Sequence, residues 1–423
     1  MDTATDDATI MRKRRVSAKG VFPTASWSEW CVRIVLLLLV ATLGYYSTTF
    51  SLAQVMAKRD PAVAYMLAPY DGRIVALYAS SLAGPEADKA QRVHADQLAR
   101  QALVEDPTAV AAVATLGIDA EVRKDPGLAR KLFAYAQTLT RRDLRTQLWS
   151  IEDAVGRGNV PQALKWYDIT LRTGPEMGAL LFPVLASASE DPSIQAELVR
   201  TLARRPPWSE HFLNFVPGNA SDPRTTAILF RNLLRAGAAV PERARAVTVD
   251  ALIAKRHYDE AWNYYLSLRP GADRRSLRDP HFQSLPAIPT QLDWVALNDD
   301  GMTTAIEDGG FGFEAPSGGG GPMLRQNLLL PPGIYRFGGQ SGELEPAEGA
   351  LPYWTVSCQG GQELARIELS SSNKGRGQFS GTIVVPRDCP VQTLTLVARP
   401  TDSVGGLSGR IYQAQLMPAR ARP

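Results

Sequence analysis

The sequence predicts a multidomain α + β protein with one N-terminal transmembrane helix, a solenoid of paired α-helices and a C-terminal antiparallel β-sandwich or jelly roll. Three observations predict this fold class. An apolar run covers residues 31–55, an Ala- and Leu-rich stretch with helical periodicity covers 60–285, and a stretch of short segments with alternating apolar residues covers 290–418. A chain of 423 residues also exceeds the usual domain size of about 100–200 residues, which favours several domains.

The N-terminal segment predicts a membrane anchor. Residues 1–30 are polar and lack apolar periodicity, so we interpret them as a disordered cytoplasmic tail. The apolar run at 31–55 is long enough, as a helix, to span a bilayer core of about 30 Å. Basic residues before this run (Arg12, Lys13, Arg14, Arg15, Lys19 and Arg33) outnumber those after it (Lys58, Arg59 and Arg73). This bias predicts a single-pass protein of the inner (cytoplasmic) membrane, with the N-terminus in the cytoplasm and the bulk in the periplasm.

Two other interpretations of the apolar run remain. A cleaved signal peptide is one, because Ser51-Leu52-Ala53 has the small-x-small pattern of a cleavage site. The long basic region before the run and the length of the run fit an anchor better. A buried core helix is the other, and it is disfavoured because no polar face interrupts residues 35–40.

A repeat of 34 residues appears in the helical stretch. Ala95, Ala129 and Ala163 are spaced by 34, and so are Phe133 and Tyr167. The middle unit has apolar and small residues at Val113, Leu116, Gly117, Ala129, Phe133 and Ala136. This spacing and pattern resemble the tetratricopeptide repeat, in which small residues let the two helices of a hairpin approach closely and the aromatic fills the gap to the next hairpin.

The resemblance implies a partner-binding groove. In tetratricopeptide proteins the first helix of each pair lines a concave surface that commonly holds a peptide or partner protein, and this register would place Glu121, Arg145 and Glu152 there. The alternative is that these charges lie on solvated helix faces, as most charged residues do. Residues 176–245 fit the repeat poorly, so we expect degenerate helical pairs and one longer connection there.

The β-rich stretch predicts a separate domain with its own core. Trp294, Tyr335 and Trp354 lie in candidate strands and are expected in the core, whereas Tyr353 and Phe311 are the candidates for exposed rings that stack on a glycan. Eight to ten strands are expected, and the candidates lie at 292–298, 302–307, 310–315, 325–330, 333–337, 353–359, 363–370, 377–385, 391–398 and 409–417.

Cys358 and Cys389 are expected to form a disulfide. They are 31 residues apart in a β domain predicted to face an oxidising compartment, and cysteines in such a domain are usually paired. A bridge needs Cα atoms within about 7 Å, so the strand at 353–359 must end beside the start of the strand at 391–398. Cys31 lies in the membrane segment and is interpreted as a small apolar residue.

Composition argues against several functional classes. With 46 Lys and Arg against 43 Asp and Glu, the net charge of +3 gives no basis for a nucleic-acid partner. Four histidines and three cysteines leave little material for a metal site, and no nucleophile elbow, phosphate-binding loop or dinucleotide fingerprint is present. We therefore expect no metal, cofactor or catalytic residue, and no enzymatic activity; an active site assembled from distant residues is the alternative.

These observations favour a membrane-anchored extracytoplasmic scaffold, or adaptor, in which tetratricopeptide-like repeats bind an envelope protein. One anchor, helical repeats and a β module together resemble envelope proteins that accompany exopolysaccharide synthesis or export in Gram-negative bacteria. The alternative is a carbohydrate-binding protein that binds polysaccharide through its C-terminal β-sandwich. Glycan pull-down distinguishes the two, as does a structure in which the candidate rings are buried.

Overall fold

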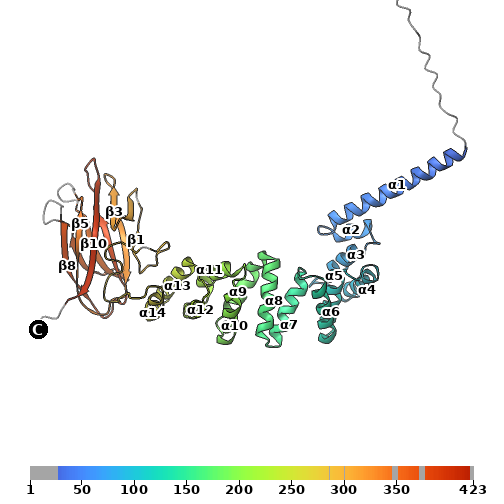
Figure 1. Ribbon diagram of the computed structural model, residues 1–423, viewed down its shortest axis with the longest axis horizontal. Helices are drawn as coiled ribbons and strands as arrows, with labels where there is room; N and C mark the ends of the chain where they lie inside the picture. The colour runs from blue at the N-terminus through green and yellow to red at the C-terminus, as the bar shows by residue number, and fades with distance from the viewer. Residues whose placement is uncertain (1–26, 285, 300, 345–350, 371–376, 420–423) are drawn as a thin grey trace, which may run out of the picture. The chain divides into compact units, whose positions relative to one another are not determined.

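A computed structural model describes residues 27–284, 286–299, 301–344, 351–370 and 377–419 (Figure 1). Most of the predicted cytoplasmic tail, residues 1–26, lies outside the described residues. The chain forms two compact units, Met1–Asp143 and Leu144–Pro423, called here the N-terminal and C-terminal units. The predicted fold class is confirmed: an apolar N-terminal helix is followed by many short paired helices and an antiparallel two-sheet sandwich.

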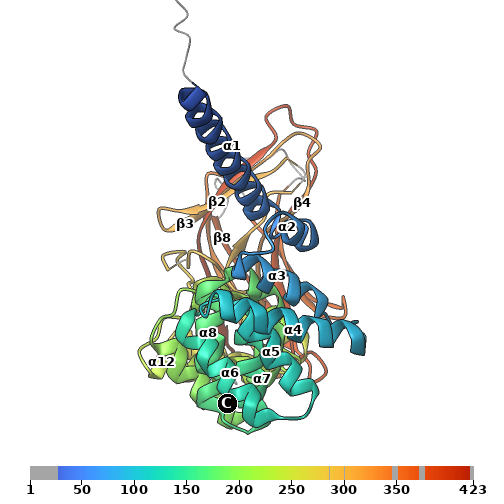
Figure 2. The same cartoon turned by 90° about the vertical axis from the view of Figure 1, so that its right-hand side faces the viewer.

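The N-terminal unit begins with the long helix α1, Trp27–Met56, which is apolar and long enough to cross a membrane (Figure 2). Helix α1 continues without a break through Ser51–Ala53, where the signal-peptide interpretation places a cleavage site. Its last turns pack on α2, Pro61–Leu67, with Ala53 fully buried in a small cluster. That cluster consists of Ala53, Ala57, Ala64, Ala68 and Ile74.

Two helical hairpins complete the N-terminal unit. Helix α3 (Gly72–Leu82) pairs with α4 (Lys89–Glu105), and α5 (Val110–Val122) pairs with α6 (Pro126–Leu139). Aspartates cap three of these helices, because their carboxylates accept hydrogen bonds from backbone N–H groups that have no partner in the first turn.

The contact between Gly117 and Phe133 explains the glycine of the repeat pattern. Gly117 of α5 faces the ring of Phe133 of α6, and a Cβ atom at Gly117 would lie 2.8 Å from two ring carbons. Ala129 of the same hairpin is fully buried, as predicted for the tight helix crossing. The small residues of the pattern therefore have the packing role that their spacing predicted.

A Gly117→Ala variant tests this contact. The added methyl group must displace a buried ring, so we expect the unfolding free energy to fall by about 1–2 kcal/mol even though alanine is the better helix former. Gly127→Ala is the matched control, because its Cβ would lie 3.4 Å from the nearest atom, an ordinary contact. Urea denaturation of the full-length protein in detergent, followed by circular dichroism, measures the unfolding free energies of both variants. A larger loss at Gly127 would contradict the packing argument.

The C-terminal unit contains eight α-helices and one short 3₁₀ helix, Pro175–Met177, in its described residues, and they follow one another through short linkers (Figure 1). The longer connection expected in 176–245 is absent there, because α9 to α12 fill that stretch. Asp-Pro pairs explain the regularity: Asp191 and Asp222 cap α10 and α12, and the proline that follows each fits the first helical position. The helices are α7 (Leu144–Gly156), α8 (Val160–Thr173), α9 (Gly178–Ala188), α10 (Pro192–Ala203), α11 (Ser209–Asn219), α12 (Pro223–Arg235), α13 (Glu242–Ala254) and α14 (Tyr258–Leu268).

In its described residues the sandwich consists of two antiparallel five-stranded sheets, and each of the ten candidate strands is found, nine of them with shifted ends. The first sheet has the order β1-β4-β9-β6-β7 and the second has the order β2-β3-β10-β5-β8. In order, the first sheet contains β1 (Val295–Ala296), β4 (Gly321–Leu328), β9 (Gln392–Ala398), β6 (Tyr353–Cys358) and β7 (Glu363–Glu368). The second contains β2 (Thr303–Glu307), β3 (Gly310–Ala315), β10 (Leu407–Pro418), β5 (Gly333–Gly342) and β8 (Gln378–Val385).

The structure joins Cys358 to Cys389, with Cα atoms 5.5 Å apart. In the β6–β9 ladder Cys358 lies opposite Gln392, so β6 ends beside the start of β9. The strand contact expected from the cysteine spacing is therefore confirmed. The bond links the end of β6 to the turn before β9 at one end of the first sheet.

The sandwich has a core of its own, but its separation from the helical core of the C-terminal unit is incomplete, which corrects the prediction of two separate cores. Leu292, Leu329 and Val391 from the β region are buried in the same hydrophobic cluster as side chains of α7 to α14. These three residues lie in segments at the end of the sandwich next to α13 and α14, so their apolar side chains are covered by helices. The main sandwich core, which contains Trp294 and Trp354, lies between the two sheets.

Candidate functional site

The residues predicted to line a groove lie in both units. Glu121 is exposed near the end of α5 in the N-terminal unit. Arg145 is half-buried and Glu152 is exposed on α7 in the C-terminal unit, two turns apart and so on one face of that helix. Their role in partner binding stays a prediction.

The two rings predicted to stack on a glycan have different surroundings. Phe311 is fully buried against Phe313 in the sandwich core, so its predicted exposure was wrong. The alternation of apolar residues in β3 predicts that Phe311 is buried, because Phe311, Phe313 and Ala315 share one face of the strand. Tyr353 is half-buried on the outer face of the first sheet, and the guanidinium groups of Arg366 and Arg399 lie 4.5 and 4.9 Å from its ring centre.

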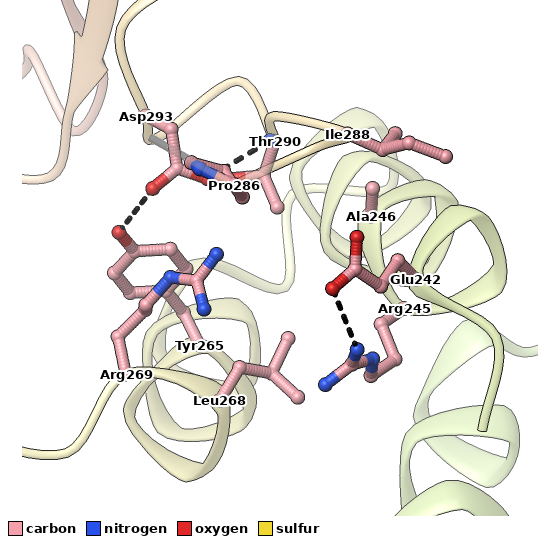
Figure 3. A pocket seen from close by; sticks show the side chains of 10 residues that line it. All are labelled: Glu242, Arg245, Ala246, Tyr265, Leu268, Arg269, Pro286, Ile288, Thr290 and Asp293. Atoms are coloured by element: carbon pink, nitrogen blue, oxygen red, sulfur yellow. Dashed lines mark hydrogen bonds and ion pairs between the residues drawn. The ribbon is translucent and has the colours of Figure 1, made fainter. Parts of the chain in front are cut away.

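A small pocket, with a volume of about 20 Å³, lies where the last helices meet the β region (Figure 3). The Tyr265 hydroxyl of α14 donates a 2.6 Å hydrogen bond to the Asp293 carboxylate, which also accepts from the backbone and hydroxyl of Thr290. Burial raises the pKa of Tyr265, and the nearby Asp293 charge adds to this effect. The phenol therefore stays protonated and acts as a fixed donor that ties α14 to the β region.

Charged side chains face one another across this pocket. Glu242 and Arg245 of α13 form an ion pair at 3.5 Å, while Leu268 and Arg269 approach from the end of α14 (Figure 3). The two carboxylates of the pocket are both engaged, Glu242 by Arg245 and Asp293 by Tyr265 and Thr290, and Leu268 and Ile288 add apolar surface. Its geometry favours a structural junction over a reaction site.

Arg278 is the central polar residue of this junction. Its side chain is 7% exposed, and its guanidinium donates to the carbonyl of Leu292 at 2.7 Å and to the carbonyl of Asn327. Its guanidinium also lies 5.9 Å from the ring centre of Trp262 and 6.0 Å from that of Tyr265. Burial lowers the pKa of Arg278 to about 10, which leaves the group charged at neutral pH. One buried cation therefore links α14, the following linker and strand β4.

The outer face of the second sheet contains a row of glutamines that reasoning from sequence missed. Gln413 of β10 lies opposite Gln340 of β5, and Gln340 lies opposite Gln378 of β8. Gln340 and Gln378 are exposed, and Gln413 is half-buried. The signal in the sequence is weak, because it consists of one glutamine in each of three strands far apart in the chain.

Tyr412 lies next to this row. Its ring is 37% exposed and packs over Gly342 of β5, where a Cβ atom would lie 2.5 Å from a ring carbon. The Tyr412 hydroxyl donates to Glu343 at 2.9 Å, and Arg410 lies 5.9 Å from the ring centre. A glycine below and a carboxylate at the tip thus hold an aromatic ring on the sheet surface.

No group of three or more His, Cys, Asp and Glu side chains in the described part of the chain is arranged to hold a metal ion.

Comparison with protein-family models and with curated proteins found no match. Among solved structures, the chain is similar to a glycosylation-associated protein (Gap123) complex from Streptococcus agalactiae, with 11% identity over 30% of this chain and 41% of that one, at a TM-score of 0.21. It is also similar to the enzymatically active domain of tailspike protein 4 from bacteriophage CBA120, with 13% identity over 30% and 19% of the two chains and a TM-score of 0.22.

A third similar structure is that of TmCBM61 in complex with β-1,4-galactotriose, with 16% identity over 35% of this chain and 97% of that chain, at a TM-score of 0.23. This chain covers less than half of the length of the first two structures. TM-scores this low do not establish a shared fold for any of the three.

Proposed function

We propose that this protein is a membrane-anchored scaffold outside the cytoplasm whose tetratricopeptide-like hairpins bind an envelope protein. The observation that carries the proposal is a regular succession of helical hairpins with an exposed apolar patch. The arrangement of domains resembles that of proteins that take part in polysaccharide synthesis or export in the cell envelope.

The packing of α1 supports an anchor over a cleaved signal peptide. Cleavage after Ala53 would cut inside a continuous helix and remove a residue that is fully buried against α2. The side chain of Gln54, one residue later, donates to Asp71 at 3.3 Å. Together with the basic residues before α1, this supports a single-pass inner-membrane protein with its N-terminus in the cytoplasm and the residues after α1 in the periplasm.

Helix α9 carries the apolar patch. Leu180 and Val184 lie one turn apart and are 56% and 54% exposed, and Pro183 between them is also exposed. Side chains at this spacing adjoin on a helix surface, so they form one patch and not scattered single residues. An apolar patch on a hairpin helix is the surface that a partner helix or loop would cover.

The test is partner recovery from native membranes. We expect full-length protein, cross-linked in membranes and purified, to retain a defined protein partner, and Leu180→Glu combined with Val184→Glu to lower its recovery by about tenfold or more, because two charges would have to be desolvated. Val404→Glu is the control, since Val404 is 99% exposed on a loop of the sandwich. Equal recovery with both variants would contradict the patch as the binding surface, and recovery after deletion of 72–268 would contradict the scaffold function.

Carbohydrate binding by the sandwich is the second candidate function. The observation that favours it is the glutamine row beside the exposed ring of Tyr412. Amides and aromatic rings provide the hydrogen bonds and stacking surface that sugars need.

A further inference from the structure

We propose that the outer face of strands β8, β5 and β10 is a binding site for a neutral glycan, with Tyr412 as the stacking ring and Gln340, Gln378 and Gln413 as hydrogen-bonding groups. The inference rests on the second candidate function, carbohydrate binding, and names its site and ligand class. These three strands are adjacent in the second sheet (Figure 1).

The glutamine row supplies hydrogen bonds at a regular spacing. Strand registers place Gln413, Gln340 and Gln378 directly across from one another, and neighbouring strands are about 4.8 Å apart. Each amide has both a donor and an acceptor, so each can bind a sugar hydroxyl in either direction. Gln415 extends the polar face, because it lies two residues beyond Gln413 and its side-chain Oε1 accepts a hydrogen bond from the Gln413 side-chain amide at 3.4 Å.

A bulge brings Tyr412 to the same face. The β10–β5 register shifts between Ile411 and Gln413, so Tyr412 and Gln413 both point outward although they are consecutive. Gly342 below the ring and the hydrogen bond to Glu343 fix its orientation. The ring is thus held next to Gln340, which is two residues from Gly342 on β5. Because the ring is already ordered, it loses little conformational entropy when a ligand binds.

The charges near the row favour an uncharged ligand. The Arg410 guanidinium donates to the backbone carbonyl of Glu307 at 2.6 Å, and the Glu343 carboxylate is bound by Tyr412. The amides of the row itself are neutral, and the exposed Arg336 on the same face of β5 lies four residues, about 13 Å, along the strand from Gln340. Tyr353 on the first sheet differs, because two arginine side chains contact its ring.

Native gel electrophoresis of the full-length protein in detergent, with polysaccharide in the gel, tests the site. The neutral probes are laminarin, hydroxyethyl cellulose and galactomannan, and alginate is the acidic probe. We expect at least one neutral polysaccharide to retard the protein, Tyr412→Ala to weaken that retardation by about tenfold, and Gln340→Ala by about fivefold, the losses typical of a stacking contact and a hydrogen bond. Tyr412→Phe keeps the ring and is expected to keep most of the affinity.

Tyr135→Ala is the matched control, since it removes a partly exposed tyrosine from helix α6, outside the sandwich. Equal melting temperatures of the variants show that lost binding is not lost folding. Retardation by a neutral glycan that survives both Tyr412→Ala and Gln340→Ala would overturn this site while leaving carbohydrate binding in place. Retardation by alginate alone would overturn the ligand class, and no retardation by any probe would overturn both the site and carbohydrate binding. None of these outcomes bears on the protein partner of the helices.

Discussion

Replacing Arg278 by methionine is expected to lower the unfolding free energy of the C-terminal unit by about 3–5 kcal/mol, the loss typical when one member of a buried polar network is removed. Methionine fills most of the volume but cannot donate to the carbonyls of Leu292 and Asn327, which would stay buried without these partners. It also removes the cation next to the rings of Trp262 and Tyr265. Because these groups come from helices and strands alike, both should lose stability together.

Arg275→Met is the control for this prediction, because Arg275 is exposed on the same linker and should change stability by less than about 0.5 kcal/mol. Urea unfolding of the full-length protein, followed by tryptophan fluorescence and by circular dichroism, measures the effect. If Arg278→Met and Arg275→Met unfold at the same urea concentration, the junction does not depend on the buried guanidinium.

The loss of the disulfide is expected to have a similar effect. Cys358 and Cys389 close a loop with a sequence separation of 31, and the chain-entropy relation gives about 3–4 kcal/mol for such a closure. Cys389→Ala should therefore lower the unfolding free energy of the C-terminal unit by about this amount. Since Val391, two residues away, is buried in the cluster shared with the helices, α13 and α14 should be destabilised along with the sandwich.

Hydrogen exchange of full-length protein with and without reductant distinguishes a core shared by the sandwich and α13–α14 from two separate cores. Loss of protection in both the sandwich and α13–α14, with α3–α6 unchanged, is the expected pattern. Protection that falls in the sandwich alone would support separate cores and contradict the shared cluster. Cys31→Ala is the control, because Cys31 is unpaired in α1.

Local patterns in the sequence were sufficient to predict the order of the helices and strands along the chain. The apolar run, the Asp-Pro pairs and the period-2 segments each depend on residues close in the chain, and these determine whether a segment is helical or extended. The burial of Ala129 in its hairpin also followed from spacing, whereas the contact of Phe133 with Gly117 inside the same hairpin was not predicted. The disulfide partners followed from composition, because the β domain has two cysteines.

The candidate sites depend on contacts between segments that are distant in the chain. Patterns in the sequence did not predict these contacts. Leu292, Leu329 and Val391 look like ordinary strand residues, and only the approach of α13 and α14 brings them into the helical core. In the sequence Arg278 is an arginine in a loop, which predicts an exposed side chain. In the structure three segments surround it and bury it.

Tyr412 shows the physical reason most clearly. Strict alternation places it on the same face as Ala414 and Leu416, which are fully buried, and so predicts a core ring. The bulge between Ile411 and Gln413 shifts the alternation by one residue and turns Tyr412 outward. A bulge arises from pairing with β5, which lies some 70 residues earlier in the chain. The sequence by itself thus determined which segments form strands, whereas their pairing in the tertiary structure decided which side chains face solvent.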